Sequence, residues 1–210
     1  MRIVRLFAAL AAAGSLTLLT SPADAAPLNK PAASTAQTVY RGEGDEVLRV
    51  PATNKPGTLR VTHGGEGAFM VQTLTSGGKK DDLLIAKIGP YRGTVAYNTS
   101  PGKKLAALSI EADGAWTVQF VPLAKAKAWP VTARGTGDQV LRLARPSQGF
   151  RTLNMTHSGE GAFLVEAYKG SGYTDLLVAK AGSYKGKVVL PAGTRWLLIK
   201  ADGSWTVVRK

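Results

Sequence analysis

Apolar and polar residues alternate in short runs along most of the chain, and turn-forming residues separate the runs. A period of two residues places successive side chains on opposite faces of a β-strand. No segment after the first 26 residues keeps a helical period. The runs in the first half are VLRV, TLRVTH, AFMVQTLT, DLLIAKI, TVAYN, LAALSIEA and WTVQFV. Short strands separated by Gly, Pro, Asn and Asp at spacings near ten residues predict an antiparallel, jelly-roll-like β-sandwich.

The second half of the chain repeats the first, block by block and in the same order. The matching blocks are RGEGDEVLRV from Arg41 and RGTGDQVLRL from Arg134, DLLIAKIGPYRG from Asp82 and DLLVAKAGSYKG from Asp175, and EADGAWTV from Glu111 and KADGSWTV from Lys200. We therefore predict an all-β protein with two tandem small antiparallel sandwiches. The predicted divisions are a signal peptide at 1–26, a flexible leader at 27–37, repeat 1 at 38–122, a linker at 123–130 and repeat 2 at 131–210.

The N-terminus has the features of a secretory signal peptide. Arg2 and Arg5 flank the start of an apolar stretch, and small residues at Ala23 and Ala25 resemble a cleavage site. The apolar stretch is shorter than the roughly 20 residues that span a bilayer, and no later stretch is longer. We expect a secreted, extracellular protein without a membrane span and, because the chain has no cysteine, without disulfides.

Charge suggests the class of partner. The chain has 27 Lys and Arg against 14 Asp and Glu, for a net charge of +13. Such an excess favours polyanions, and outside the cell these are envelope polymers, acidic glycans, anionic lipids or released nucleic acid. We expect a polyanionic envelope polymer or glycan and no specific nucleic acid; the alternative is that the lysines only solubilise the surface. The candidate lysines are Lys79, Lys80, Lys103, Lys104, Lys125, Lys127, Lys185 and Lys187.

One ten-residue motif occurs twice, as THGGEGAFMV from Thr62 and THSGEGAFLV from Thr156. Alternation turns His63 and His157 toward the core at a strand end, where a ring nitrogen can bond the backbone of the following Gly-rich turn. We favour this structural role. The functional alternative pairs each histidine with the glutamate three residues later, as metal ligands or as an acid and base.

A metal site at this motif would need more ligands, because zinc takes three or four protein ligands. The aspartates Asp45, Asp82 and Asp113 recur as Asp138, Asp175 and Asp202 and could contribute only if their loops converge. Asp-Gly between two strands is a common hairpin signal, which favours a turn role for Asp113 and Asp202. We expect no metal and no cofactor.

Aromatic residues divide into repeated and unrepeated positions. Tyr91 and Tyr184 are predicted to be corner tyrosines whose hydroxyl bonds a neighbouring backbone group, and Trp116 and Trp205 to fill the core. The unrepeated tryptophans, Trp129 and Trp196, are candidates for an exposed stacking surface or for packing the two repeats together.

The repeats resemble secreted, functionally uncharacterised actinobacterial proteins built from β-sandwich repeats. The motifs that carry the resemblance are the GxGD opening, T-H-S-G-x-G-x-F, D-L-L-V, G-x-Y-x-G and A-D-G-x-W-T, and they cover both copies almost completely. The resemblance implies the sandwich fold and assigns no activity.

Enzyme motifs are absent from the sequence: it has no G-x-S-x-G, no H-E-x-x-H, no phosphate-binding glycine loop and no cysteine nucleophile. We expect a non-enzymatic interaction module that binds a polyanion through a basic surface. The alternatives are a carbohydrate-binding module that uses Trp129, Trp196 or Tyr173, a secreted protein-binding or inhibitor protein, and a glycosidase that needs only carboxylates. The sequence does not determine the oligomeric state.

Overall fold

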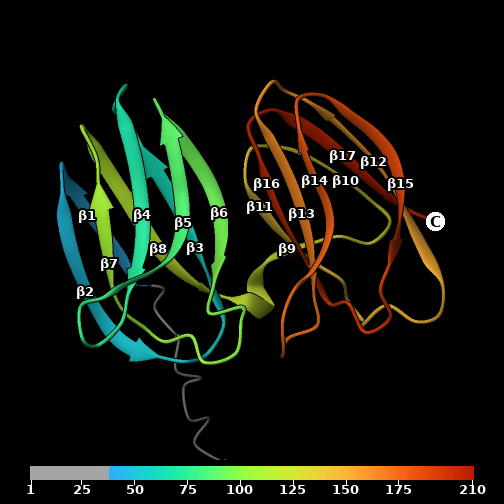
Figure 1. Cartoon of the computed structure of the whole chain (residues 1–210), viewed down its shortest axis with the longest axis horizontal. Coiled ribbons are helices and arrows are strands. Elements are labelled where there is room, and N and C mark those ends of the chain that lie inside the picture. Colours follow the sequence, from blue (N-terminus) through green and yellow to red (C-terminus); the bar gives the residue numbers. More distant parts are fainter. Residues whose placement is uncertain (1–37) are drawn as a thin grey trace, which may run out of the picture. The chain divides into compact units, whose positions relative to one another are not determined.

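The computed structural model describes residues 38–210. Their β-strands form four sheets, two for each repeat (Figure 1). The pairing is antiparallel throughout, apart from one short parallel pair in repeat 2. The predicted all-β fold with two sandwiches is therefore confirmed. The described residues, 38–210, belong to one compact unit. The predicted signal peptide and leader lie outside the described residues.

Repeat 1 consists of eight strands. One sheet has the order β1-β8-β3-β6 and the other β2-β7-β4-β5. The strands are β1 (Val39–Glu43), β2 (Glu46–Thr53), β3 (Gly57–His63), β4 (Ala68–Leu74), β5 (Lys80–Ile88), β6 (Tyr91–Tyr97), β7 (Leu105–Glu111) and β8 (Ala115–Pro122).

Repeat 2 has the same plan with one short strand added. Its sheets have the orders β10-β17-β12-β15 and β14-β13-β16-β11-β9. The strands are β9 (Lys127–Ala128), β10 (Thr132–Thr136), β11 (Gln139–Arg142), β12 (Arg151–Ser158), β13 (Ala162–Tyr168), β14 (Asp175–Ala181), β15 (Tyr184–Leu190), β16 (Trp196–Ala201) and β17 (Ser204–Arg209).

Alternation along the strands produces the two cores. In β3, Leu59, Val61 and His63 are buried whereas Arg60 is exposed. In each repeat, the two sheets contribute their inward residues to one apolar cluster. Among residues 38–210, no helix is long and apolar enough to cross a membrane.

The strand β1 was not among the runs that the sequence pattern predicts. It pairs with β8, and its Gly42 lies opposite Trp116. A Cβ on Gly42 would lie 2.2 Å from Cζ2 of Trp116, so the indole covers this part of the backbone. Because the side chain of Trp116 covers β1, this strand lacks the alternation of apolar residues that the other strands have.

The predicted linker is ordered and belongs partly to repeat 2. A 3-10 turn, η1 (Leu123–Lys125), precedes β9, which pairs with β11. Trp129 follows with only 1% of its surface exposed, and it joins the core of repeat 2.

Candidate functional site

The duplicated motif forms the same cluster in each repeat. In repeat 1, Nδ1 of His63 lies 3.2 Å from the carbonyl oxygen of Gly89, and Nε2 lies 3.1 Å from Oδ1 of Asp113. Because a carbonyl oxygen only accepts hydrogen bonds, Nδ1 is assigned as the donor. The ring stacks on Phe69 with centroids 4.3 Å apart.

Asp113 connects two turns that are far apart in the sequence. Its Oδ2 accepts hydrogen bonds from the backbone N–H groups of Glu66 at 3.1 Å and Gly67 at 2.6 Å. These bonds, led by that from Gly67, lower the pKa of Asp113, with a smaller contribution from His63. The carboxylate beside His63 thus comes from Asp113, not from the side chain of Glu66.

Repeat 2 reproduces the cluster closely. His157 Nδ1 lies 2.9 Å from Gly182 O, and its Nε2 lies 3.1 Å from Oδ1 of Asp202. Asp202 Oδ2 accepts from Glu160 N at 3.0 Å and Gly161 N at 2.5 Å. In both repeats the histidine bonds the turn before β6 or β15, so the predicted bond to the following Gly-rich turn is wrong. Among residues 38–210, no three His, Asp or Glu side chains are grouped to hold a metal.

Tyr91 makes a contact that the sequence did not predict. Its hydroxyl donates to Oδ2 of Asp138 in the other repeat at 2.9 Å, rather than to a neighbouring backbone group. Asp138 is 2% exposed, and its Oδ1 accepts from Ala201 N at 2.9 Å. Burial, followed by the charge of Asp138, raises the pKa of Tyr91. Tyr184 makes no hydrogen bond through its hydroxyl within residues 38–210.

The tryptophans have three different environments. Trp116 and Trp205 are buried in the cores, and their Nε1 groups donate to Gly44 O and Gly137 O. The exposed stacking role is wrong for Trp129, which is buried because it fills the core of repeat 2. Trp196 is half-buried, donates to Leu123 O at 3.1 Å and packs beside a small cluster between the repeats. Of the three aromatic glycan-binding candidates, only Tyr173 is largely exposed.

The predicted lysines are distributed over several surfaces. Lys80 pairs with Glu111 at 3.0 Å, and Lys103 pairs with Asp81 and Asp82, which raise its pKa. Lys127 donates to Arg134 O and Gln139 Oε1. The remaining candidates are exposed: Lys79, Lys104, Lys125, Lys185 and Lys187. Of these, only Lys185 and Lys187 are neighbours on one side of a strand, β15.

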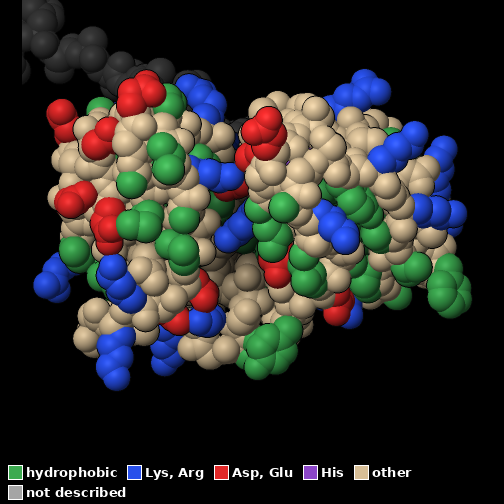
Figure 2. All heavy atoms as spheres, turned by 45° about the horizontal axis from the view of Figure 1, so that its top comes forward, with side chains coloured by type: hydrophobic (Ala, Val, Ile, Leu, Met, Phe, Trp, Pro, Cys, Tyr) green, Lys and Arg blue, Asp and Glu red, His purple; other side chains and the backbone are tan. Residues whose placement is uncertain are grey.

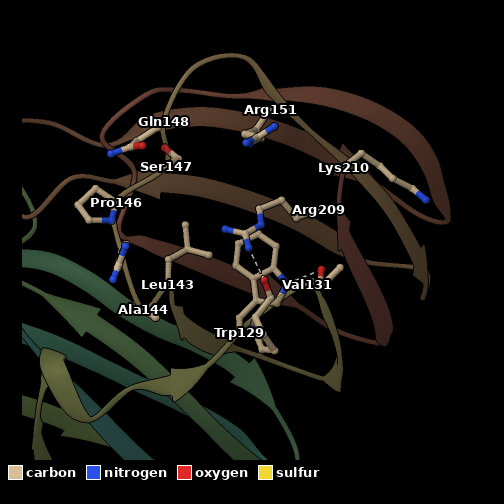
Figure 3. A pocket seen from close by; sticks show the side chains of 12 residues that line it. Trp129, Val131, Leu143, Ala144, Pro146, Ser147, Gln148, Arg151, Arg209 and Lys210 are labelled. Atoms are coloured by element: carbon tan, nitrogen blue, oxygen red, sulfur yellow. Dashed lines mark hydrogen bonds between the residues drawn. The ribbon is translucent and has the colours of Figure 1, made fainter.

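A basic hollow of about 640 Å³ lies at one end of repeat 2 (Figure 3). The buried apolar residues Trp129 and Leu143 lie among the residues that line it, and none of the lining residues is acidic. We use the name basic hollow for this site and its cationic side chains. These are Arg145, Arg151, Arg209 and Lys210.

These cations come from separate elements around the hollow. Arg151 begins β12 and Arg209 ends β17, and the two strands pair. Arg145 lies in the loop from β11 to β12, where Ser147 anchors the backbone. Ser147 Oγ donates to Pro191 O at 2.6 Å, and Ser147 N donates to Thr194 O at 2.8 Å. Arg209 itself donates to Pro130 O at 2.5 Å, which holds its guanidinium in the hollow.

Sequence reasoning missed the basic hollow because it considered lysines and set the arginines aside. A comparison of the two repeats would have found it. Counting along the repeats from the paired strands places Ala52, Gly57, Phe120 and Val121 of repeat 1 at the positions of Arg145, Arg151, Arg209 and Lys210. Repeat 2 thus has four cations where repeat 1 has none.

No protein-family model matches the chain, and no curated protein matches it in sequence.

Proposed function

We propose that the protein is an exported, non-enzymatic module that binds a polyanionic polymer of the cell envelope or extracellular space through the basic hollow of repeat 2. The observation that carries this proposal is that four basic residues and no acidic one line the hollow. Export is supported by the signal-peptide features at the N-terminus.

The chemistry of the basic hollow suits phosphate or carboxylate groups. A guanidinium presents its donors as a planar fork that matches both groups in bidentate geometry. Like charges held together in a concave site also raise the local concentration of a counter-ion. Phe150 is the last residue of the loop from β11 to β12 and is 97% exposed, so it offers an apolar contact to the backbone or sugar of such a polymer.

Binding to polyphosphate and to purified bacterial envelope would test the proposal. In a triple variant, Arg145→Ala, Arg151→Ala and Lys210→Ala, affinity should fall at least about tenfold because each cation meets an anionic group. The matched control removes three exposed cations elsewhere, Lys79, Lys104 and Lys125, and should bind nearly as the parent protein does. Equal losses in both variants would reduce the interaction to net charge, and no loss in either would overturn the proposal.

A neutral glycan is the second candidate ligand, and the exposure of Tyr173 favours it. Exposed aromatic rings stack on the apolar faces of sugars, and such binding depends little on salt. Tyr173→Ala should then abolish binding to a neutral polysaccharide without lowering the melting temperature. Retained glycan binding in this variant would exclude Tyr173 as the stacking residue.

A further inference from the structure

The two repeats contact each other through two chemically different faces. Repeat 1 contributes Tyr91, whose hydroxyl lies 2.9 Å from Asp138 Oδ2, and Thr94, whose backbone N–H lies 2.9 Å from Asp138 O. Lys87 Nζ of repeat 1 reaches Ala201 O at 3.4 Å. We call the side of repeat 1 around Tyr91 its tyrosine face, and the side of repeat 2 around Asp138 its aspartate face.

Apolar side chains complete this contact. Val140 of the aspartate face is 2% exposed, and Leu198 is also buried. They share a cluster with two residues of the linker, Leu123 and Ala126, and Ala96 of β6 packs against it. The contact between the repeats therefore combines specific hydrogen bonds with a small dry cluster.

Because the chain is duplicated, each repeat has both faces, and only one of each is covered. Within residues 38–210, the aspartate face of repeat 1 and the tyrosine face of repeat 2 remain uncovered. Val47 shows the difference: it occupies the position of Val140 yet is 57% exposed. Val189 of β15, at the position of Ala96, is likewise 57% exposed.

The uncovered aspartate face has the same geometry as its covered counterpart. Asp45 Oδ1 accepts from Ala112 N at 2.8 Å, as Asp138 Oδ1 accepts from Ala201 N. Within residues 38–210, Asp45 Oδ2 has no hydrogen-bond partner, whereas the same atom of Asp138 binds a tyrosine. The position that a tyrosine hydroxyl would occupy is thus open.

The uncovered tyrosine face is also preformed. A Cβ on Gly186 would lie 2.2 Å from the hydroxyl of Tyr184, and a Cβ on Gly93 would lie 2.2 Å from that of Tyr91. The tyrosine therefore lies over its glycine in the same way in both repeats. No rearrangement of Tyr184 is needed to present its hydroxyl to a carboxylate, which lowers the ordering cost of binding.

The two uncovered faces carry opposite charges. Figure 2 shows acidic side chains together with some basic ones over repeat 1, and mainly basic side chains over the outer side of repeat 2. Close to Asp45 in the sequence are Glu43 and Glu46, and on β14 and β15, beside Tyr184, are Lys180, Lys185 and Lys187. Opposite charges on two faces of one molecule attract another copy in a head-to-tail orientation.

We propose that a second copy of this chain docks head to tail, so that Tyr184 of one copy binds Asp45 of the next. The contact repeats the one between repeats 1 and 2. It lacks the covalent linker and its two apolar residues, so it is weaker than the contact within the chain. Because the two faces differ, each docked copy leaves one face of each kind uncovered, and the assembly grows as an open row.

Sedimentation velocity of the mature protein, in buffer without any polyanion, tests the proposal. The average mass should rise continuously between about 1 μM and 1 mM and should fall when salt is added. Two variants each remove one face: Val47→Lys places a cation on the aspartate face, and the double variant Tyr184→Phe with Lys187→Glu disables the tyrosine face. Each variant alone should remain monomeric.

Mixing these two variants gives the decisive result. Each retains the face that the other lacks, so an equimolar mixture should form dimers and no larger species. A matched control, Lys104→Glu, makes the same charge change at an exposed loop position outside both faces and should associate as the parent protein does. A parent protein that stays monomeric, a mixture that stays monomeric, or variants that still associate would overturn the proposal.

Discussion

The two repeats share their strands and their histidine clusters but differ at one end of the sandwich. In repeat 1 this end is filled by aromatic rings. Phe120 lies edge-on to Tyr40 and to Tyr97, each at 5.8 Å between centroids. Gly57 provides the space, because a Cβ there would lie 2.3 Å from the hydroxyl of Tyr97.

In repeat 2 the same end is open and carries basic side chains. The smaller Ala133 and Leu190 occupy the positions of the two tyrosines, and Arg209 takes that of the phenylalanine. Trp129 then enters from the linker to complete the core, and Arg151 stands where repeat 1 has its glycine. One copy thus has a closed apolar end, whereas the other has the basic hollow. Because repeat 1 has the same fold without basic residues at this end, the fold does not require the basic residues of repeat 2.

Removing Trp129 should have the largest effect. Trp129→Ala leaves a cavity in the core of repeat 2 and should lower its stability by about 3–5 kcal/mol. Repeat 1 closes its own end with Phe120 and should be affected much less. Denaturant unfolding monitored by amide hydrogen exchange would separate the repeats, and equal losses in both would contradict the comparison.

The paired tyrosines should respond unequally. Tyr91→Phe leaves a carboxylate oxygen of Asp138 buried without its partner and should cost about 1–3 kcal/mol. Tyr184→Phe removes a hydroxyl that has no hydrogen-bond partner within residues 38–210 and should change stability by less than about 0.5 kcal/mol. Urea unfolding of dilute protein measures the loss in free energy of unfolding for each variant. Equal losses would show that the hydrogen bond from Tyr91 to Asp138 adds little to stability.

A single cation of the basic hollow should affect polyanion binding moderately. Arg151→Ala should weaken polyphosphate binding severalfold and lower the slope of log affinity against log salt by about 0.7–0.9, the change per ionic contact known from nucleic acids. Arg60→Ala, on β3 of repeat 1, removes the same charge at another exposed position. Arg60→Ala should leave the slope of log affinity against log salt nearly unchanged. A change as large as that of Arg151→Ala would show that binding depends on net charge and not on the basic hollow.

The smallest effect should come from acid, and it should be shared by both repeats. The folded protein holds the pKa values of Asp113 and Asp202 below the ordinary 3.8, chiefly through backbone N–H bonds from Gly67 and Gly161. The stability that these carboxylates contribute is therefore complete above that pH and is lost as the pH falls through the lower folded values.

Substitution by asparagine should remove this acid dependence. Asp113→Asn and Asp202→Asn should each flatten the fall of the melting temperature below about pH 4, because asparagine does not titrate there. Scanning calorimetry across that range checks it. A variant with the same acid dependence as the parent protein would assign the effect to other carboxylates.

The sequence predicted what local patterns determine. Alternation identified β3 and its inward His63, because the period of a strand is a property of neighbouring residues. It could not show that Asp113 would bond Gly67, since that contact depends on which turns the sheet order brings together. The same reason explains the missed contact between Tyr91 and Asp138. Trp129 was misjudged because its burial depends on a core whose other residues come from strands throughout repeat 2.

The burial of Trp129 has an evolutionary consequence. A gene rearrangement that moved residues 131–210 alone would transfer every strand of the repeated plan yet leave the transferred copy without its largest linker-derived core residue. A transferred segment that keeps the core of repeat 2 complete must therefore start upstream of Trp129. Recombination is less restricted in this way for the first repeat than for the second.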